Sequence, residues 1–331
     1  MADRSNAASD LRGSWYDLLV CIGKGSTTSV HLARPCGSES ATPVALKRLH
    51  PKLAADAAAR RALLAEGVIG QRVHHPNVVG VHEVEDLDDE LLVAMDYVEG
   101  ASLAELLRAW PLLPAPVAVR ILLDAAAGLG ALHGLHDDAR RPLGVVHLDV
   151  SPHALLVGLD GTTRVGDLGG ATCRTFRNHG PSDRQRRHPG YAPPEYLLGH
   201  PFDARADVFS LGVLAWELLA AHPIFVAAGE LATCQRVVCM EAPRISAVVP
   251  ELGEAFELVL ERALAKDPAV RFSSMEQLAA ALRAASAFSG GVAAPYDVGT
   301  LVEDRVGDAL ACRRVDIEGA MVPTSGIYLR S

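Results

Sequence analysis

Apolar positions along this chain follow a strand pattern near its start and a helix pattern in several later segments. Over 18–30, an apolar run, a glycine-containing turn and a second apolar run predict two strands joined by a turn. The apolar run 91–98 predicts a buried strand, and the Ala- and Leu-rich segments 53–71 and 278–287 predict helices. The pattern therefore predicts strands within the first hundred residues and helices in both halves of the chain.

The C-terminal part is set off by a Ser- and Gly-containing break at 286–291. Beyond the break, apolar residues recur at helical spacing and predict an amphipathic helix over 296–314. The residues that carry this pattern are Val298, Leu301, Val302, Val306 and Leu310. Packing of this helix onto the rest of the chain is the favoured interpretation, and binding of a partner is the alternative.

Composition narrows the class of protein. The 331 residues are 49% hydrophobic, with a mean hydropathy of +0.17, so the chain can bury a large core and is not a disordered regulator. A net charge of −9 gives no electrostatic footprint for nucleic acid. The apolar stretch 211–221 is interrupted by Glu217 and is too short to span a bilayer, and residues 1–5 do not resemble a signal peptide. We therefore expect a cytoplasmic protein with no nucleic-acid or membrane partner.

Two carboxylates mark the most informative part of the sequence. Asp149 lies within His-Leu-Asp-Val-Ser-Pro-His-Ala at 147–154, and Asp167 precedes Leu168 and Gly169. Phosphoryl transfer needs its charge neutralised and its reacting oxygens aligned more than it needs covalent help. One carboxylate can orient an attacking hydroxyl, and the other can hold Mg²⁺ beside a turn that glycine permits. The two motifs therefore indicate a phosphoryl-transfer site.

Further motifs precede and follow these carboxylates in order. Gly23 and Gly25 lie in the first predicted turn, where glycine lets backbone N–H groups approach phosphates, although an ordinary hairpin turn has the same appearance. Val-Ala-Leu-Lys follows at 44–47, and Glu66 lies on the next predicted helix. Later motifs are His-Pro-Asn at 75–77, Gly-Tyr-Ala-Pro-Pro-Glu at 190–195, Asp-Val-Phe-Ser-Leu-Gly at 207–212 and Lys-Asp-Pro-Ala-Val-Arg-Phe at 266–272.

In this order, the motifs resemble those of the eukaryotic-like bacterial serine/threonine protein kinases, from about residue 15 to about residue 285. The resemblance implies an α+β, bilobal protein-kinase-like fold. A small N-terminal antiparallel β lobe with one helix would span 15–95, and a hinge and a larger, mainly α-helical lobe would span 96–285. A polar tail would occupy 1–14, and 286–331 would hold the linker, the amphipathic helix and a C-terminal tail.

The resemblance also implies a role for each matching residue. Asp149 would act as the base, Lys47 would grip the ATP phosphates while paired with Glu66, and Asp167 would hold Mg²⁺. Met95 would lie behind the adenine, whose edge would bond the backbone near 96 and 98. Glu195 and Arg271 would form a structural ion pair. The expected ATP-binding residues are Ile22, Gly23, Gly25, Val30, Ala45, Lys47, Met95, Asp96 and Val98.

Several positions depart from the family pattern. Leu148 stands at the catalytic-loop Arg, Ser151 at the Lys two residues after the catalytic Asp, and Ala154 at the metal-binding Asn. His188 replaces a Thr common in the family, and Leu168 is a milder replacement of a packing Phe. In the glycine loop, Thr28 replaces the third glycine and predicts a stiffer loop. His153 is considered as a substitute metal ligand, but its position before 154 makes it the less favoured choice.

The segment between Asp167 and Glu195 is basic. Because Leu148 replaces the Arg that receives a phosphate in many relatives, we do not expect the usual control by phosphorylation of this segment. Modification with local arginines as partners remains an alternative to a solvated basic loop. The residues concerned are Arg174, Arg177, Arg184, Arg186 and Arg187, with Thr172, Thr175 and Ser182 as candidate acceptors and Asp183 as the one acid.

Three functions stay open at the level of sequence. The first is a protein kinase, with weak activity, that transfers the ATP γ-phosphate to Ser or Thr hydroxyls of a protein substrate. The second is a pseudokinase that serves as a nucleotide-sensitive scaffold for a signalling partner. The third, least favoured, is a small-molecule phosphotransferase of related fold, which the protein-kinase motifs at 75–77 and 190–195 argue against.

Overall fold

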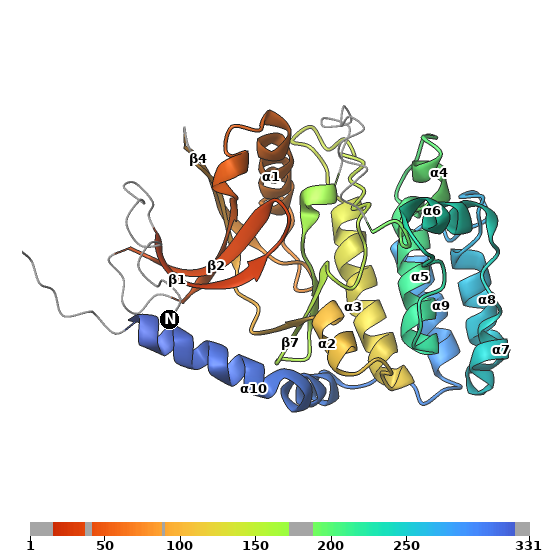
Figure 1. The fold of residues 1–331 in the computed structure, drawn as a ribbon. Coiled ribbons are helices and arrows are strands. Elements are labelled where there is room, and N and C mark those ends of the chain that lie inside the picture. The colour runs from red at the N-terminus through yellow and green to blue at the C-terminus, as the bar shows by residue number, and fades with distance from the viewer. Residues whose placement is uncertain (1–15, 37–41, 88–89, 172–187, 322–331) are drawn as a thin grey trace, which may run out of the picture.

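A computed structural model describes residues 16–36, 42–87, 90–171 and 188–321 as two lobes joined by a short connection (Figure 1). The smaller lobe holds a five-stranded sheet and one α-helix, and the larger lobe is mainly helical. This arrangement confirms the predicted α+β, bilobal architecture. The candidate phosphorylation positions and arginines at 172–187 and the polar tail at 1–14 lie outside the described residues.

The N-lobe sheet is antiparallel throughout, in the order β1-β2-β3-β5-β4. Its side chains alternate between two apolar clusters, as the period of a strand requires. In β5, Leu92 packs with Leu46 on one face, whereas Leu91 and Val93 pack with Leu63 of the helix on the other. The strands are β1 (Tyr16–Lys24), β2 (Thr28–Pro35), β3 (Val44–Leu49), β4 (Val81–Leu87) and β5 (Glu90–Asp96).

One helix, α1 (Ala57–Gly70), covers the sheet after the 3₁₀ turn η1 (Pro51–Leu53). The Asp56 side chain caps it by accepting hydrogen bonds from the N–H groups of residues 58 and 59. A Cβ added at Gly67 would lie 2.4 Å from a Val84 methyl carbon, which is too close for any other residue. The glycine therefore lets α1 lie close against β4, and the adjacent Glu66 on α1 bonds Lys47 of β3.

The C-lobe core surrounds α3 (Ala115–His133), the one described helix long and apolar enough to cross a bilayer; 67% of that stretch is buried inside the protein, as in the core helices of globular proteins. A small sheet, β6-β7-β8, lies at the lobe junction. The other elements are β6 (Gly100–Ser102), α2 (Leu103–Ala109), β7 (Leu155–Gly158), β8 (Thr163–Val165), η2 (Leu168–Gly170), α4 (Pro194–Leu197), α5 (Arg205–Ala220), α6 (Glu230–Cys239), α7 (Ile245–Val248), η4 (Pro250–Leu252), α8 (Gly253–Ala263) and α9 (Met275–Ser286).

Two polar contacts fix the C-lobe segments that the sequence motifs marked. Arg271 makes two hydrogen bonds to the Glu195 carboxylate, at 2.7 and 2.8 Å, and both side chains are buried. The predicted Glu195–Arg271 pair is therefore formed. In the His-Pro-Asn turn, the Asn77 N–H donates to His75 Nδ1, and the Asn77 amide donates to the Thr163 carbonyl at 2.9 Å.

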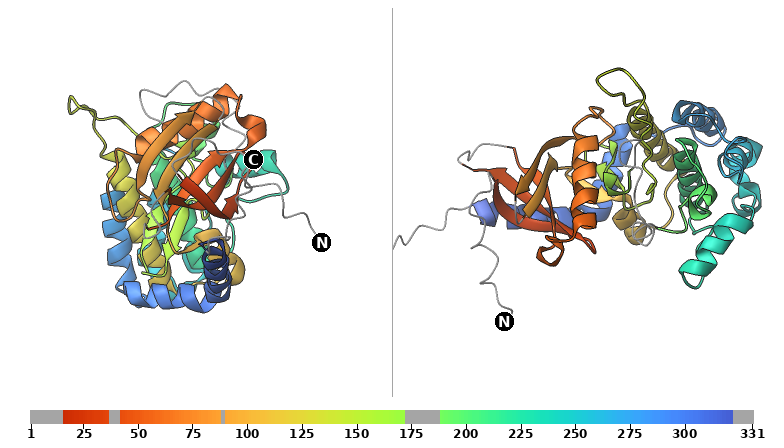
Figure 2. Two further views of the ribbon diagram at one scale, coloured as in Figure 1. Left: turned by 90° about the vertical axis from the view of Figure 1, so that its left-hand side faces the viewer. Right: turned by 90° about the horizontal axis from the view of Figure 1, so that it is seen from above.

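The helix α10 (Pro295–Met321) leaves the C lobe and runs beneath both lobes (Figures 1 and 2). It contacts β1, β6, β7, α2 and α3 of the same chain. A Cβ at Gly299 would lie 2.3 Å from the Leu159 carbonyl oxygen, so glycine permits the close approach of α10 to the β7–β8 turn. The helix is longer than the predicted 296–314, and its apolar residues Val298, Val302 and Leu310 are buried against the chain itself.

Candidate active site

A cavity of about 460 Å³ lies between the lobes, at the connection between β5 and β6. All nine predicted ATP-binding residues line it, from Ile22 and Gly23 in β1 to Met95, Asp96 and Val98 at the end of β5. Ala45 and Met95 lie opposite each other in the β3–β5 register, and both line the cavity. The chain thus gathers the predicted residues around one space of a size typical of small-molecule sites.

Lys47 lies at the centre of the charged end of this cavity. Its Nζ is 2.8 Å from both Glu66 carboxylate oxygens and 2.7 Å from Asp167 Oδ1. The predicted Lys47–Glu66 pair is therefore formed, and it also reaches the predicted metal ligand. The Lys47 and Glu66 side chains are only 10% and 6% exposed, whereas the Asp167 side chain is 51% exposed. Asp167 is thus the partner that remains accessible to a ligand.

The charges of this trio follow from its geometry. Burial by itself lowers the pKa of Lys47, but the adjacent Asp167 and Glu66 carboxylates raise it overall, so the amine stays protonated. Lys47 lowers the pKa of Asp167, which stays ionised at neutral pH. Burial raises the pKa of Glu66, and Lys47 offsets only part of that increase. This trio therefore presents one buried cation to phosphates and one accessible carboxylate to a metal ion.

Asp167 adopts a left-handed backbone conformation, with φ of 51°, directly before η2. Such a conformation is uncommon for residues other than glycine and is concentrated at functional sites. The next side chain, Leu168, is only 3% exposed and packs in the core, within reach of α1 at Gly70. The packing of Leu168 beneath α1 thus helps to keep the Asp167 carboxylate within hydrogen-bond distance of Lys47.

The Asp207 carboxylate anchors the backbone of the loop that carries Asp149. Its two carboxylate oxygens accept the backbone N–H groups of His147 and Leu148, at 2.7 and 2.8 Å, and His133 Nε2 lies 2.7 Å from it. Burial raises the pKa of Asp207, but His133 and these partners lower it overall. Leu148 has a φ of 64°, a conformation that needs such support in a residue with a side chain. Sequence reasoning identified this Asp only as part of a helix start and missed its role.

His147 joins the two loops that carry the carboxylates. The ring is fully buried, its Nε2 lies 3.0 Å from the Gly166 carbonyl oxygen, and the Asp149 N–H donates to its Nδ1 at 3.2 Å. These partners assign the proton to Nε2. The residue that precedes Asp167 and the backbone of Asp149 are therefore fixed relative to each other by one imidazole.

The substituted positions lie where the resemblance placed them, but they do not supply the missing groups. The Ser151 side chain is buried, and its hydroxyl has no hydrogen-bond partner within the described part of the chain. Ala154 lines the cavity, is only 2% exposed and offers no metal ligand. Leu148 is 2% exposed and packs in an apolar cluster with Ala192 and Tyr196. That cluster, and not a phosphate-binding Arg, joins the catalytic loop to the segment before α4.

Asp149 and His188 meet at the edge of an adjoining cavity of about 350 Å³, which shares Gly25, Lys47 and Asp167 with the first. His188 Nδ1 lies 3.3 Å from Asp149 Oδ1. This hydrogen bond raises the pKa of His188. The predicted base therefore faces the same charged end of the cleft as the Lys47 trio, and an imidazole stands beside it.

The glycine loop is tied at its tip. The Gly25 N–H donates to the Thr28 carbonyl at 2.8 Å, and His50 Nε2 lies 2.9 Å from the Gly25 carbonyl oxygen. The His50 N–H also bonds the Thr27 carbonyl. Sequence reasoning did not include His50, because no motif marks it. These bonds connect the loop to the end of β3.

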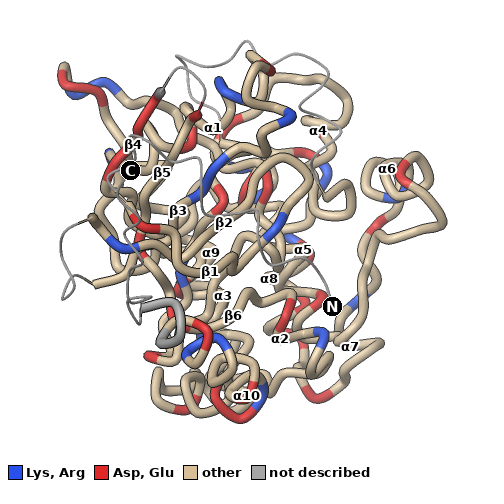
Figure 3. The backbone as a smooth tube through the Cα atoms, turned by 60° about the vertical axis from the view of Figure 1, so that its left-hand side comes forward, with Lys and Arg blue, Asp and Glu red and all other residues tan. Residues whose placement is uncertain are grey.

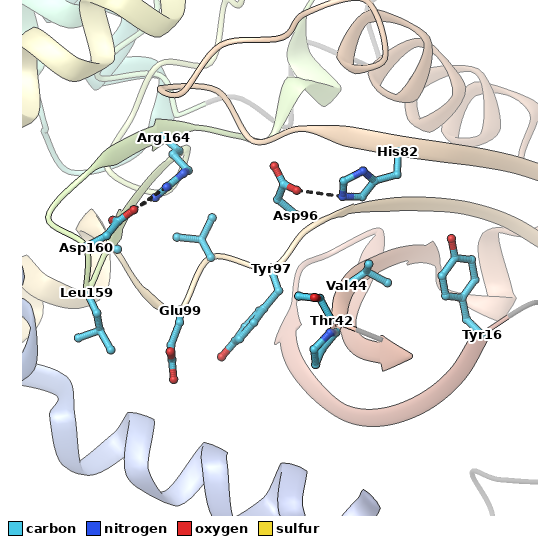
Figure 4. Close-up of a pocket in the computed structure, with 13 residues that line it drawn as sticks. Tyr16, Thr42, Val44, His82, Asp96, Tyr97, Glu99, Leu159, Asp160 and Arg164 are labelled. Carbon is cyan, nitrogen blue, oxygen red and sulfur yellow. Dashed lines mark hydrogen bonds and ion pairs between the residues drawn. The ribbon is translucent and has the colours of Figure 1, made fainter. Parts of the chain in front are cut away.

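A third cavity, of about 650 Å³, lies behind the β5–β6 connection (Figure 4). Its charged side chains already have partners: His82 lies 2.9 Å from Asp96, and Arg164 lies 2.6 Å from Asp160. Glu99 is bonded to Arg314 of α10 at 2.6 Å. Since its ionic groups are satisfied, we assign no chemistry to this cavity. Acidic and basic residues both occur along α10 (Figure 3).

No group of three or more His, Cys, Asp and Glu side chains is arranged to hold a metal ion within the described ranges. Asp167 therefore offers a single carboxylate from the protein. This suits Mg²⁺, which in nucleotide sites is bound by one or two carboxylates together with phosphates and water.

Comparison with known proteins agrees with the geometry. Residues 16–282 match the family described as "Protein kinase domain". The chain is 29% identical over 272 residues to the tyrosine-protein kinase MasK of Myxococcus xanthus, covering 81% of the chain and 42% of that protein. It is 31% identical over 297 residues to the serine/threonine-protein kinase PknJ of Mycobacterium tuberculosis, covering 88% and 48%. With the serine/threonine-protein kinase PksC of Streptomyces coelicolor the identity is 32%, covering 84% and 50%.

Among solved structures, the Mycobacterium tuberculosis PknI kinase domain aligns with a TM-score of 0.63 and 28% identity, covering 82% of this chain and 96% of that one. The fold is thus that of a protein kinase. The chain spans about half the length of the curated relatives it matches. With its motifs, its two-lobed fold and the family match over 16–282 in agreement, this chain belongs to the protein kinase family.

Proposed function

We propose that this chain is an ATP-dependent serine/threonine protein kinase with slow phosphoryl transfer. One observation supports this above all: Lys47, Glu66 and Asp167 form a connected trio, and Asp149 faces the same end of the cleft. A Lys–Glu pair and a metal-binding Asp held in place together are what protein kinases require for transfer.

The residues present fit ATP. The adenine would lie between Ala45 and Val30 above and the β5 end below, with Met95 behind it. Lys47, kept protonated by two carboxylates, would bind the α and β phosphates. Backbone N–H groups near Gly23 and Gly25 would cover the phosphates, because neither glycine carries a side chain that would block their approach.

Transfer would proceed as one displacement at the γ-phosphorus. A substrate Ser or Thr oxygen forms a bond to that phosphorus, the bond to the β–γ bridging oxygen breaks, and ADP leaves. The hydroxyl proton passes to the Asp149 carboxylate. Bound Mg²⁺, held by Asp167, would neutralise the phosphate charge. Ala154 cannot hold a second ion, so we expect a lower rate than in relatives with Asn at that position.

The loss in the rate of phosphoryl transfer can be estimated from the missing groups. Each missing positioning group costs on the order of 10² in rate. Ser151, Ala154 and His188 stand at three such positions, but losses within one cluster are not additive. Slow transfer, and not complete loss, is therefore the proposal, since Lys47 and Asp149 are both retained.

The proposed kinase function also implies where substrates would bind, where the protein would act and which hydroxyls it would phosphorylate. Protein substrates or signalling partners would meet the cleft on the side of Asp149 and His188. We propose a cytoplasmic location, because a protein kinase needs ATP and ATP is available there. Ser and Thr are the proposed acceptors, because PknJ and PksC are named as serine/threonine-protein kinases. MasK is named as a tyrosine-protein kinase, so Tyr is the acceptor against which the proposal must be tested.

The first test is a thermal-shift titration with ATP, with Mg²⁺ and with EDTA, since a ligand of the native state raises its apparent stability. We expect a magnesium-dependent increase that Asp167→Ala abolishes. Incubation with γ-³²P-ATP and casein, followed by phosphoamino-acid analysis, then identifies the acceptor. Label in phosphotyrosine would contradict the Ser/Thr assignment, and no label in casein or in the chain itself would contradict transfer.

A nucleotide-sensitive pseudokinase is the second candidate function. It is favoured by the buried Ser151 hydroxyl, which has no hydrogen-bond partner among the described residues, and by the Ala154 methyl group at the metal-binding position. The two candidates separate in the same experiments, because a pseudokinase of this kind would show the ATP-dependent increase in melting temperature without any label transfer.

A further inference from the structure

His188 is the side chain, among those described, that hydrogen-bonds the Asp149 carboxylate. Its Nδ1 lies 3.3 Å from Asp149 Oδ1. Asp149 is only 14% exposed, so few other groups can reach its oxygens, whereas His188 is 42% exposed and borders the cleft. The contact joins residues that are 39 positions apart, from the catalytic loop and from the segment before α4.

The His188 ring is held from several sides. His153 stacks on it, with ring centroids 4.8 Å apart and planes 9° from parallel. Tyr191 lies edge-on at 6.5 Å, and its N–H bonds the His188 carbonyl at 3.0 Å. The Tyr191 hydroxyl in turn donates to Glu217 of α5 at 2.6 Å. The imidazole is therefore fixed relative to a helix of the C-lobe core, which a positioning group must be.

The groups that hold the base in related kinases are missing here. Ser151 stands at the Lys position, and its hydroxyl is buried without a partner in the described chain, so it does not reach Asp149. His188 itself stands at the Thr position. Asp149 thus lacks both the Lys and the Thr that would hold it. His188, which replaces the Thr, places a different hydrogen-bond donor beside the Asp149 carboxylate.

We propose that His188 is a positioning residue that orients the Asp149 carboxylate towards the substrate hydroxyl, in place of the missing Lys and Thr. The inference rests on the proposed kinase function. His188 also lines the cavity that contains Lys47, Gly25 and Asp167, where the transferred phosphoryl group would lie. The described ionisable groups around the imidazole are Asp149, His153, Asp167 and Tyr191.

Three substitutions separate the hydrogen bond from the bulk of the side chain. His188→Leu keeps the size but removes the donor. His188→Asn places an amide nitrogen where Nδ1 lies, and His188→Gln places it where Nε2 lies. Since Nδ1 is the atom that faces Asp149, only the Asn variant should retain the contact. His200→Gln is the matched control, because His200 is exposed and its recorded bond is made by its backbone.

The experiment measures kcat and KM for ATP with γ-³²P-ATP and casein, and the melting temperature of each variant. We expect His188→Leu and His188→Gln to lower kcat about 10- to 100-fold with KM for ATP and melting temperature nearly unchanged, because misplacing a base slows the chemical step without weakening nucleotide binding. His188→Asn should recover most of the activity, and His200→Gln should match the unmodified chain.

The possible results separate a failure of the proposed role of His188 from a failure of the kinase function itself. If the unmodified chain transfers phosphate and His188→Leu does so equally well, the inference is overturned while the kinase function stands. If Leu and Asn lower kcat equally, or if KM for ATP rises with kcat unchanged, positioning through Nδ1 is also ruled out. If the unmodified chain transfers nothing to casein or to itself, the proposed function fails first, and the role of His188 in transfer fails with it.

Discussion

In the nucleotide half of the cleft, Lys47 bonds two carboxylates at 2.7 to 2.8 Å, whereas in the transfer half Asp149 has one imidazole partner at 3.3 Å. The first set is largely buried and matches the protein-kinase pattern residue by residue. The second has lost three expected side chains and gained His188. The two halves of one cleft have therefore diverged to different degrees.

This difference separates binding from chemistry. Nucleotide binding depends on fixed charges and close backbone approach, both of which the N-lobe retains. Transfer depends on aligning a hydroxyl, a proton acceptor and one or two metal ions, and these groups lie in the altered half. A chain of this kind is expected to bind ATP well and to transfer phosphate slowly. Each of the following experiments changes a residue of one half and measures the effect on binding, transfer or stability.

The largest expected effect comes from Asp149→Asn. An amide cannot accept the substrate proton, so transfer should fall about 10²- to 10⁴-fold. The ATP-dependent increase in melting temperature should not change, because Asp149 does not line the nucleotide cavity. Label transfer measures the activity of the transfer half, and the thermal shift measures ATP binding in the nucleotide half. Asp160→Asn, in the β7–β8 turn, is the control carboxylate and should behave as the unmodified chain; equal transfer by Asp149→Asn would refute its role as the base.

Lys47→Met should disrupt the nucleotide half. It leaves Glu66 buried without its cation, which costs about 3 kcal/mol in the free energy of unfolding. Urea denaturation measures this loss. The double variant Lys47→Met with Glu66→Gln should regain part of it, since a neutral amide is cheaper to bury than an unpaired carboxylate. If both variants were equally unstable, the loss would come from packing and not from the unpaired charge.

Ala154→Asn tests whether the transfer half can be repaired. Ala154 lines the cavity, although it is only 2% exposed, so an amide at this position would lie next to the space for a second metal ion. We expect transfer to rise about 10- to 100-fold, with the KM for ATP nearly constant. Ala154→Leu is the control, because it fills the same space without a ligand. An equal rate for Asn and Ala would show that the missing metal ligand does not limit transfer.

A smaller effect is expected for the pH dependence of the His188–Asp149 contact. The Asp149 hydrogen bond raises the pKa of His188 above its usual 6.5. The stabilisation from the charged pair is therefore complete below about 6.5 and is lost as the pH rises through the raised pKa of the folded state. Because His188 is 42% exposed, this contribution stays under about 1 kcal/mol.

NMR titration of the imidazole measures that pKa directly, and unfolding between pH 5.5 and 8.5 measures the matching stability. Asp149→Asn should lower the pKa of His188 towards the ordinary value and flatten the stability profile. An unchanged imidazole pKa in that variant would show that the two side chains do not interact in solution, whether or not the chain is an active kinase.

Much of the nucleotide half could be predicted from sequence because its parts are short motifs in a fixed order. The Lys47–Glu66 and Glu195–Arg271 pairs were predicted and are formed. Their partners are far apart in the chain, but each sits on an element whose identity the family pattern supplies. The transfer half could not be predicted in the same way, because the residues that replace the usual ones have no pattern to compare with.

The sequence alone determined the two lobes, the cleft residues and the absence of the usual groups at Ser151 and Ala154, because side-chain chemistry and motif order are properties of the chain. Only the tertiary structure decided that His188 bonds Asp149, that His153 stacks on His188, and that α10 packs beneath both lobes of its own chain. These contacts join segments that are distant in sequence. Tertiary packing, and not the local sequence pattern, determines where such segments meet.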